Sequence, residues 1–208
     1  MALGLYPGCS LKGSSREYAE SVLALSKAFG IDIKEINDWN CCGATAAHNM
    51  NRELSLALPA RILSLAEKQG LTEIVVPCAA CYSRLTVTSH ELSLDPGLVK
   101  TIAEVNGLEY SGKVEVLNII QMINKYVAPK LEGKIIKPFS YKVACYYGCL
   151  LVRPHEILLF DREEDPQSMD EVMLKAGATP VDWAFKTECC GAGLSVSRTS
   201  SVGRLSGR

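Results

Sequence analysis

The sequence predicts an α/β fold with mostly parallel strands, and three observations support this prediction. Short apolar segments alternate with longer segments whose apolar residues recur at helical spacing. Glycine or proline stands at many of the junctions between them. The pattern then restarts, because "YKVACYYGC" at 141–149 resembles "ALGLYPGC" at 2–9. Alternating strands and helices typically form a parallel sheet flanked by helices.

The first half contains four expected strands, at 2–6, 31–36, 73–78 and 113–118. Helices are expected at 17–29, 51–69 and 119–127, with a kink or break at Pro59. Ser14 and Glu17 have the spacing of a capping box, and Asp95-Pro96 predicts the start of a further short helix. These elements account for one sheet with helices between its strands.

The second half repeats this order in a shorter form. A strand within 141–149 is followed by a helix that opens at Ser168 with capping-box spacing to Glu171 and stops at Gly177. A further strand is expected at 179–183. The last residues are rich in Ser, Gly and Arg, so we expect the segment 196–208 to be poorly ordered.

Composition excludes several functional classes. Of the 208 residues, 48% are apolar, which suffices for a core and argues against a disordered chain. The formal charge of −1 gives no reason to expect nucleic acid as a partner. The sequence has no apolar run long enough to span a bilayer and no secretion signal. We therefore expect a cytoplasmic protein without a direct membrane span, leaving open membrane association through a partner.

Nine cysteines are the chemical signature of the chain. Stable disulfides are rare in a reducing compartment, and Cys145 inside an expected strand is explained by packing alone. Packing does not explain two adjacent pairs that are each followed by Gly-Ala, in "NCCGAT" and "ECCGAG". Because loops after parallel strands share one edge of a sheet, one set should converge there. That set is Cys9, Cys41, Cys42, Cys78 and Cys81.

Five thiolates exceed the four ligands of a zinc site, so an all-thiolate set favours iron–sulfur chemistry, with zinc as the alternative. Gly8 and Gly43 would let the backbone approach a cluster and donate N–H groups to it. A disulfide between Cys41 and Cys42 would strain the intervening peptide and is disfavoured.

The motif Cys-x31-Cys-Cys-Gly-x34-Cys-x-x-Cys resembles the CCG-domain signature of the heterodisulfide reductase B-subunit family. "YPGCSLKGSS", "DWNCCGATAAH", "LALPARIL", "VVPCAACYSRL" and "KVACYYGCLLVRP" strengthen the resemblance, which covers about 2–195. It implies two CCG domains, each binding a non-cubane [4Fe-4S] cluster. The five cysteines above would hold the first cluster. The second site would begin with Cys149, Cys189 and Cys190.

The family pattern also requires a Cys-x-x-Cys about 36 residues after Cys190, whereas the sequence ends at Arg208. We therefore expect an incomplete second site. The expected organisation is a first CCG domain at 1–135, a partial second CCG domain at 136–195 and the tail at 196–208. The second copy is accordingly expected to be the smaller sheet-and-helix unit.

The resemblance implies the catalytic component of a heterodisulfide reductase. Such a protein reduces a small disulfide, formed from the methanogenesis coenzymes M and B or an analogue, to two thiols. Electrons would come from two partner proteins of the complex, a ferredoxin-like C-subunit and a flavin-containing A-subunit. The alternatives are an electron-transfer component of a lactate- or glycolate-oxidising complex and a zinc-stabilised interaction module.

Histidines and arginines near the cysteines are secondary candidates. His48 could donate a proton, although a surface role is the simpler explanation. His155 could lie near the second site, while His90 is expected to be an ordinary helix residue. Arg84 and Arg153 could attract an anionic substrate or remain solvated. Trp39 and Trp183 are expected to be packing residues.

Overall fold

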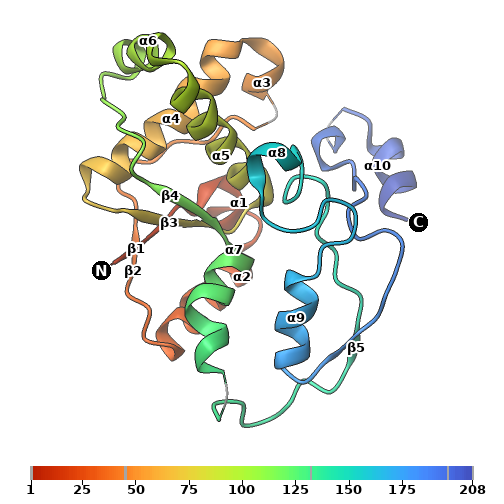
Figure 1. Cartoon of the computed structure of the whole chain (residues 1–208). Helices are drawn as coiled ribbons and strands as arrows, with labels where there is room; N and C mark the ends of the chain where they lie inside the picture. Colours follow the sequence, from red (N-terminus) through yellow and green to blue (C-terminus); the bar gives the residue numbers. More distant parts are fainter. Residues whose placement is uncertain (1, 45, 132, 196, 208) are drawn as a thin grey trace. The chain divides into compact units, whose positions relative to one another are not determined.

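The computed structural model describes residues 2–44, 46–131, 133–195 and 197–207. The chain divides into two compact units, Met1–Glu132 and Gly133–Arg208. Figure 1 shows the course of the chain through both units, with the four-stranded sheet in the first. The sheet and its helices confirm the predicted α/β class.

The first unit is built on four parallel strands in the order β2-β1-β3-β4. The strands are β1 (Leu3–Leu5), β2 (Ile33–Glu35), β3 (Glu73–Val76) and β4 (Glu115–Asn118), each inside a predicted segment. β1 pairs with both β2 and β3, for example Gly4 with Lys34 and with Ile74. The chain leaves β1 toward one edge and returns to the other side at β3, so the strand order reverses between these two strands. Such reversal points open a crevice at the carboxyl ends of the strands.

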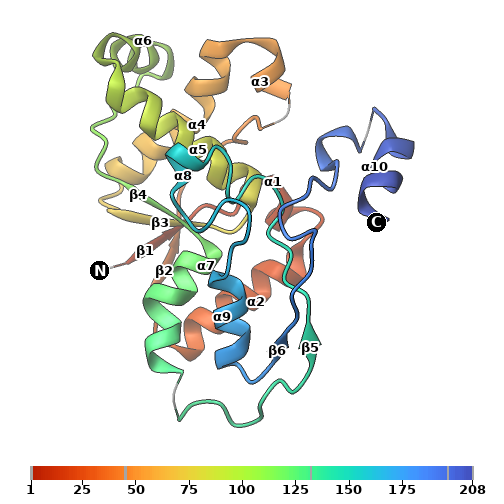
Figure 2. The same ribbon diagram turned by 45° about the vertical axis from the view of Figure 1, so that its right-hand side comes forward.

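Helices cover both faces of this sheet (Figures 1 and 2). On one face, α2 (Arg16–Ala28), α7 (Ile119–Met122) and the π-helical turn Ile123–Val127 pack against the strands through a core that includes Leu5, Val22 and Met122. On the other face lie α4 (Arg52–Lys68), α5 (Ala79–Leu94) and α6 (Pro96–Asn106). These three helices share a second cluster of buried residues that includes Leu56, Leu92 and Ile102. Two short helices, α1 (Gly8–Lys12) and α3 (Ala46–Met50), follow the loops after β1 and β2.

The observed helix boundaries show which local sequence signals predicted the ends of the helices correctly. Asp95 caps α6 by accepting from the Leu98 N–H at 3.0 Å, as predicted. α2 begins one residue after Ser15 without a side-chain cap, so the predicted capping box at Ser14 does not form. α4 runs unbroken from Arg52 to Lys68 with Pro59 inside it, so it does not divide into two shorter helices. Pro59 is buried in the core, where packing holds the helix despite the missing N–H.

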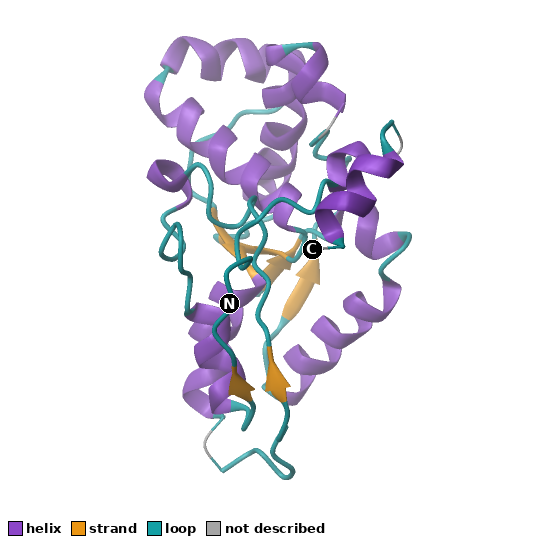
Figure 3. Cartoon of the chain, turned by 90° about the vertical axis from the view of Figure 1, so that its right-hand side faces the viewer, coloured by secondary structure: helices purple, strands orange, loops and turns teal. Residues whose placement is uncertain are grey.

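The second unit contains a short parallel pair, β5 (Lys142–Val143) with β6 (Thr179–Pro180), as shown in Figure 3. Its helices are α8 (His155–Leu158), α9 (Ser168–Lys175) and α10 (Thr199–Ser206). The start of α9 lies where it was predicted, but not because of a capping box. Instead Asp161 Oδ2 accepts from the Ser168 N–H at 2.7 Å, and the Tyr147 hydroxyl accepts from the Met169 N–H at 2.7 Å.

The end of the chain differs from the prediction. Helix α10 lies within 196–208, the segment that was expected to be poorly ordered, and a 3₁₀ turn, Ala192–Leu194, precedes it. The reason is local packing, because Val202 and Leu205 lie three residues apart on α10 and both approach Gly191. A β-carbon built on Gly191 would meet Leu205 Cδ1 at 2.9 Å.

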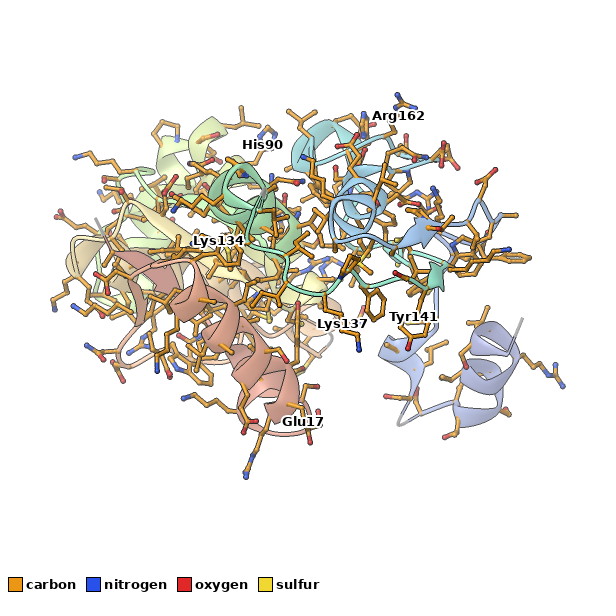
Figure 4. All side chains as sticks on the ribbon, turned by 90° about the horizontal axis from the view of Figure 1, so that it is seen from below. Glu17, His90, Lys134, Lys137, Tyr141 and Arg162 are labelled. Atoms are coloured by element: carbon orange, nitrogen blue, oxygen red, sulfur yellow. The ribbon has the colours of Figure 1, made fainter. Side chains whose placement is uncertain are left out.

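The exposure of His90 agrees with a minor prediction. His90 is exposed on α5, where Figure 4 labels it. Within the described residues, no helix combines the length and the hydropathy that a membrane crossing requires.

Candidate metal centre

Three loops at the carboxyl edge of the first sheet carry the five cysteines of the first set. Cys9 lies in α1, directly after β1, and Cys41 and Cys42 lie on the loop between β2 and α3. Cys78 follows β3 as the N-cap residue of α5, and Cys81 lies in the first turn of that helix. Cys9 and Cys78 therefore flank the point where the strand order reverses.

The structure brings these side chains together. Cys42 Sγ and Cys81 Sγ are 3.2 Å apart, and both residues are buried. Cys78 interacts with the Cys81 thiol and with the Ser10 hydroxyl. Cys41 interacts with the Cys9 thiol, and both of these cysteines are exposed. The set thus consists of a buried group around Cys81 and an exposed pair, Cys9 with Cys41.

The neighbouring sulfurs perturb one another. The Cys81 thiol and the amide N–H groups of Cys81 and Ala80 lower the pKa of Cys78 to about 6, although burial opposes the shift. The Cys81 thiol likewise lowers the pKa of Cys42. The pKa of Cys81 itself is raised far above its usual value, because its proton is shared with Cys42 and Cys78 and its surroundings are buried. The thiolate form is thus favoured at Cys42 and Cys78 and disfavoured at Cys81, which lies between them.

Two glycines shape the backbone around the sulfurs. Gly8 has φ +62°, and a β-carbon there would lie 3.2 Å from Cys81 Sγ. Gly43 has φ +69°, and a β-carbon there would meet Leu58 and Ala47 at 2.7 and 2.8 Å. The Gly43 N–H points at Cys41 Sγ, 3.5 Å away. Only glycine fits these positions without strain, because L side chains rarely adopt positive φ and no space is free.

A hydrogen-bond network that sequence reasoning missed holds the Cys41–Cys42 loop. Arg61 of α4 donates to the Asp38 carbonyl at 2.7 Å, to Asn40 Oδ1 at 3.1 Å and to Asp38 Oδ2 at 2.5 Å. Asn40 Nδ2 donates to the Leu58 carbonyl at 3.0 Å. The buried Tyr6 hydroxyl donates to the Asn40 carbonyl at 2.9 Å. No local signal marks Arg61, because its partners lie over 20 residues away.

Two of the secondary candidates in the first unit, His48 and Arg84, contact each other. Arg84 Nη1 lies 2.9 Å from His48 Nδ1, which joins α5 to the exposed end of α3. Because guanidinium only donates, Nδ1 must be the acceptor, and the proton of a neutral His48 is on Nε2. Trp39 behaves as the packing residue that was predicted, with its ring 5.7 Å from the Tyr6 ring and its Nε1 bonded to Glu35.

The donor set of this site consists of sulfur alone. The five thiol groups extend from the buried Cys42–Cys81 contact to the exposed Cys9–Cys41 pair. Iron–sulfur clusters bind thiolate ligands and accept hydrogen bonds from backbone N–H groups. A donor set made of sulfur alone, next to glycines that leave the backbone accessible, suits such a cluster.

The second cysteine set repeats part of this geometry in the second unit. The Gly191 N–H points at Cys189 Sγ at 3.3 Å, and Gly191 has φ +76°. Burial and the neighbouring Cys189 raise the pKa of Cys149. A cavity of about 220 Å³ adjoins Cys189 and Cys190 and is lined by three aromatic side chains, those of Tyr146, Trp183 and Phe185. The structure therefore places Cys149 beside Cys189 and near Cys190, the three residues that the resemblance assigns to a second site.

The remaining candidates of this unit have other contacts. Arg153 pairs with Glu164 at 3.2 Å and with Glu163 at 3.6 Å, so its charge is balanced within the unit. His155 begins α8, and its Nδ1 is buried without a hydrogen-bond partner among the described atoms. Cys145 is buried, consistent with packing, and its carbonyl accepts from Trp183 Nε1 at 2.8 Å.

Comparison with known proteins agrees with this geometry. The chain is 32% identical over 190 residues to the "8-methylmenaquinol:fumarate reductase membrane anchor subunit" of Wolinella succinogenes. It is 31% identical over 196 residues to the B-subunit of the "Ferredoxin/F(420)H(2)-dependent CoB-CoM heterodisulfide reductase" of Methanosarcina acetivorans. These alignments cover 89% and 92% of the chain but only 66% and 65% of the relatives, so the chain spans about two thirds of their length.

A solved structure shares the fold. A hypothetical protein from Helicobacter pylori superposes with a TM-score of 0.68 at 13% identity, covering 96% of this chain and 36% of that one. The family model described as a cysteine-rich domain, CCG, matches residues 3–86 and 143–206. The two matched segments contain every cysteine of both sets, and the predicted resemblance to the heterodisulfide reductase B-subunit is confirmed. The chain therefore belongs to the cysteine-rich CCG-domain family.

Proposed function

We propose that the chain is an iron–sulfur redox protein that reduces a small-molecule disulfide to two thiols. The observation that carries the proposal is the convergence of five cysteines from three loops at the carboxyl edge of one parallel sheet. The similarity to the heterodisulfide reductase B-subunit adds the reaction class. The substrate would be the coenzyme M–coenzyme B heterodisulfide or an analogue of it.

Cys9, Cys41, Cys42, Cys78 and Cys81 would hold a [4Fe-4S] cluster, which we infer to be non-cubane because five thiols surround the site. Cys149, Cys189 and Cys190 would contribute to a second one. When bound, such a cluster supplies single electrons and iron as a Lewis acid. The lowered pKa values of Cys42 and Cys78 favour the thiolate form that metal binding requires.

Reduction of one disulfide consumes two electrons and two protons and yields two thiols. His48 would donate a hydrogen bond from Nε2 to a substrate sulfur, because its contact with Arg84 leaves Nδ1 as an acceptor; to release a proton it would also need Nδ1 protonated in place of that contact. Arg84 carries positive charge beside this histidine, and within the described residues no carboxylate forms an ion pair with it. The electrons would come from partner proteins, by resemblance a ferredoxin-like C-subunit and a flavin-containing A-subunit.

Anaerobic reconstitution tests the proposal. We expect stoichiometric iron and acid-labile sulfide, and oxidation of a reduced viologen dye that depends on added heterodisulfide. Replacing both Cys42 and Cys81 by serine should abolish iron uptake at the first site, whereas Cys145→Ser should leave it unchanged because Cys145 is a packing residue of the other unit. Stoichiometric zinc without sulfide would refute the redox function and favour a zinc-stabilised module.

A second candidate is an electron-transfer protein without its own disulfide substrate, like those of lactate- or glycolate-oxidising complexes. It is favoured by the name of the Wolinella relative, which belongs to a fumarate reductase. Electron paramagnetic resonance separates the two candidates. A cluster signal that changes when a substrate thiol is added supports disulfide reduction, and one that does not change supports electron transfer alone.

A further inference from the structure

The same tyrosine contact occurs in both units. In the first unit Tyr6 stands three residues before Cys9, and its hydroxyl donates to the carbonyl of Asn40, the residue before the double cysteine. In the second unit Tyr146 stands three residues before Cys149, and its hydroxyl donates to the carbonyl of Glu188, again the residue before the double cysteine. The distances are 2.9 and 2.6 Å.

Each of these tyrosines also lies beside a cysteine sulfur. A β-carbon built on Gly8 would lie 3.2 Å from Cys81 Sγ and 3.7 Å from two atoms of the Tyr6 ring, so ring and sulfur line the same small space. The Tyr6 side chain interacts with that of Cys81, and the Tyr146 side chain interacts with that of Cys190.

Tyr6 is therefore a hydrogen-bond donor with two acceptors in reach. Its ring is 1% exposed, so water does not compete for the hydroxyl. In the thiol form the carbonyl of Asn40 is the better acceptor, as the 2.9 Å contact shows. A negatively charged sulfur is a stronger acceptor than a neutral one, because charge-assisted hydrogen bonds are about twice as strong.

We propose that Tyr6 is a positioning residue of the first cysteine set. In the metal-free protein its hydroxyl fixes the loop that carries Cys41 and Cys42, and it turns to donate to Cys81 Sγ once that sulfur holds metal. Tyr146 occupies the corresponding place in the second unit. The part that concerns bound metal rests on the proposed iron–sulfur function, whereas the part that concerns the loop does not.

The substitution Tyr6→Phe tests both parts. Tyr110→Phe is the matched control, because its half-buried hydroxyl contacts Ser89 at 2.7 Å in the same unit and the groups that shift its pKa, Ser89 and Glu67, include no cysteine. In the metal-free protein, loss of one buried hydrogen bond should speed amide hydrogen exchange across 38–43 about fivefold. Tyr110→Phe should leave that segment unchanged. Equal exchange in the two variants would overturn the proposal.

In the reconstituted protein, the reduced form carries more negative charge, so removing a donor disfavours it. Tyr6→Phe should lower the reduced-to-oxidised ratio at a fixed potential about tenfold, which for one electron is about 59 mV. An unchanged midpoint in a fully loaded variant would overturn the role at Cys81. Absence of iron and sulfide in the unmodified chain would instead overturn the proposed function. It would also overturn the role of Tyr6 at bound metal, but not its role in holding the loop.

A fallback measurement covers the case in which Tyr6→Phe does not fold. Replacing all tyrosines by 3-fluorotyrosine keeps each hydroxyl but makes it a stronger donor, so the midpoint should rise. Adding Tyr110→Phe to the labelled protein should not reverse that rise. A midpoint that stays in place despite full labelling would contradict the proposal.

Discussion

Arg61→Met is expected to loosen the loop that carries Cys41 and Cys42. Arg61 is the main link between that loop and helix α4, through bonds to the Asp38 carbonyl and to Asn40 Oδ1. Methionine retains most of the apolar stem and removes every donor. Because Asn40 precedes Cys41, the loss should be felt directly at the double cysteine.

The magnitude follows from exposure. The Arg61 side chain is 29% exposed, so we assign each of its two bonds to Asp38 O and Asn40 Oδ1 about 1 kcal/mol, below the range for fully buried charged donors. The Asp38 carboxylate is 78% exposed, so its ion pair adds at most about 0.5 kcal/mol. The free energy of unfolding should therefore fall by about 2.5 kcal/mol. Arg61→Lys should cost about half of this, because an ammonium cannot reproduce the forked contacts.

Urea unfolding of the metal-free protein measures this difference. A Trp183→Phe background leaves Trp39 as the single tryptophan, so fluorescence reports the unit that contains the loop. Arg52→Met is the matched control, because Arg52 lies on the same helix and pairs with Glu91 while its side chain is 78% exposed. It should cost less than about 0.5 kcal/mol. Equal losses for Arg61→Met and Arg52→Met would refute the argument that Arg61 holds the loop.

Three further results are expected. Gly43→Ala should sharply reduce iron and sulfide uptake, whereas Gly30→Ala, also at positive φ but in open space, should cost only about 1–2 kcal/mol and leave uptake intact. Lys186→Met should destabilise the second unit by about 3 kcal/mol in urea unfolding followed by Trp183 fluorescence, because it leaves the buried Asp170 carboxylate unpaired. Lys186 also lowers the pKa of Asp165 in the folded protein. The ionised carboxylate therefore stabilises the fold at pH values above about 4, the pKa of Asp in the unfolded chain, and this stabilisation is lost as the pH falls through the lower pKa of the folded state. Asp165→Asn should flatten this part of the acid-unfolding curve, and an unchanged curve would count against the contact.

The fold was largely predictable because its signals are local. Strands β1 and β3 lie in short apolar runs, and the Asp95 cap is encoded within four residues. The second unit was less predictable, because "YKVACYY" yields only the two-residue strand β5. The start of α9 depends on Asp161 and Tyr147, which lie 7 and 22 residues from the amides they bind. Such partners leave no periodic signal in the sequence.

The residues of the candidate site likewise divide into those that the sequence predicted and those that it did not. The cysteines and glycines were found because their side chains and spacing are chemically unusual, and the parallel topology brings them to one edge. Arg61 and Tyr6 were missed because ordinary arginine and tyrosine residues acquire their roles only through contacts across the fold. The repeat could have revealed Tyr6, since "LYPGC" and "YYGC" place a tyrosine three residues before cysteine in both copies.

The double cysteine followed by glycine is best understood as a turn whose geometry separates two sulfurs. In each copy the third residue is a glycine at positive φ, and its N–H points back to the first sulfur, at 3.5 Å in one unit and 3.3 Å in the other. The amide thus holds the first sulfur, on exposed Cys41 or Cys189, as an Asx-turn holds a side-chain oxygen. The second sulfur is turned the other way, and in the first unit it reaches Cys81.

Adjacent side chains of an extended chain point to opposite faces, so the two sulfurs of a pair can reach different neighbours. A β-carbon at Gly43 would collide with Leu58 and Ala47, which explains why the third position is glycine rather than another small residue. The same turn in the second unit meets a different surface, because Gly191 is bounded by Val202 and Leu205 of α10. The same Cys-Cys-Gly backbone turn therefore occurs in both units, while the side chains packed against it differ.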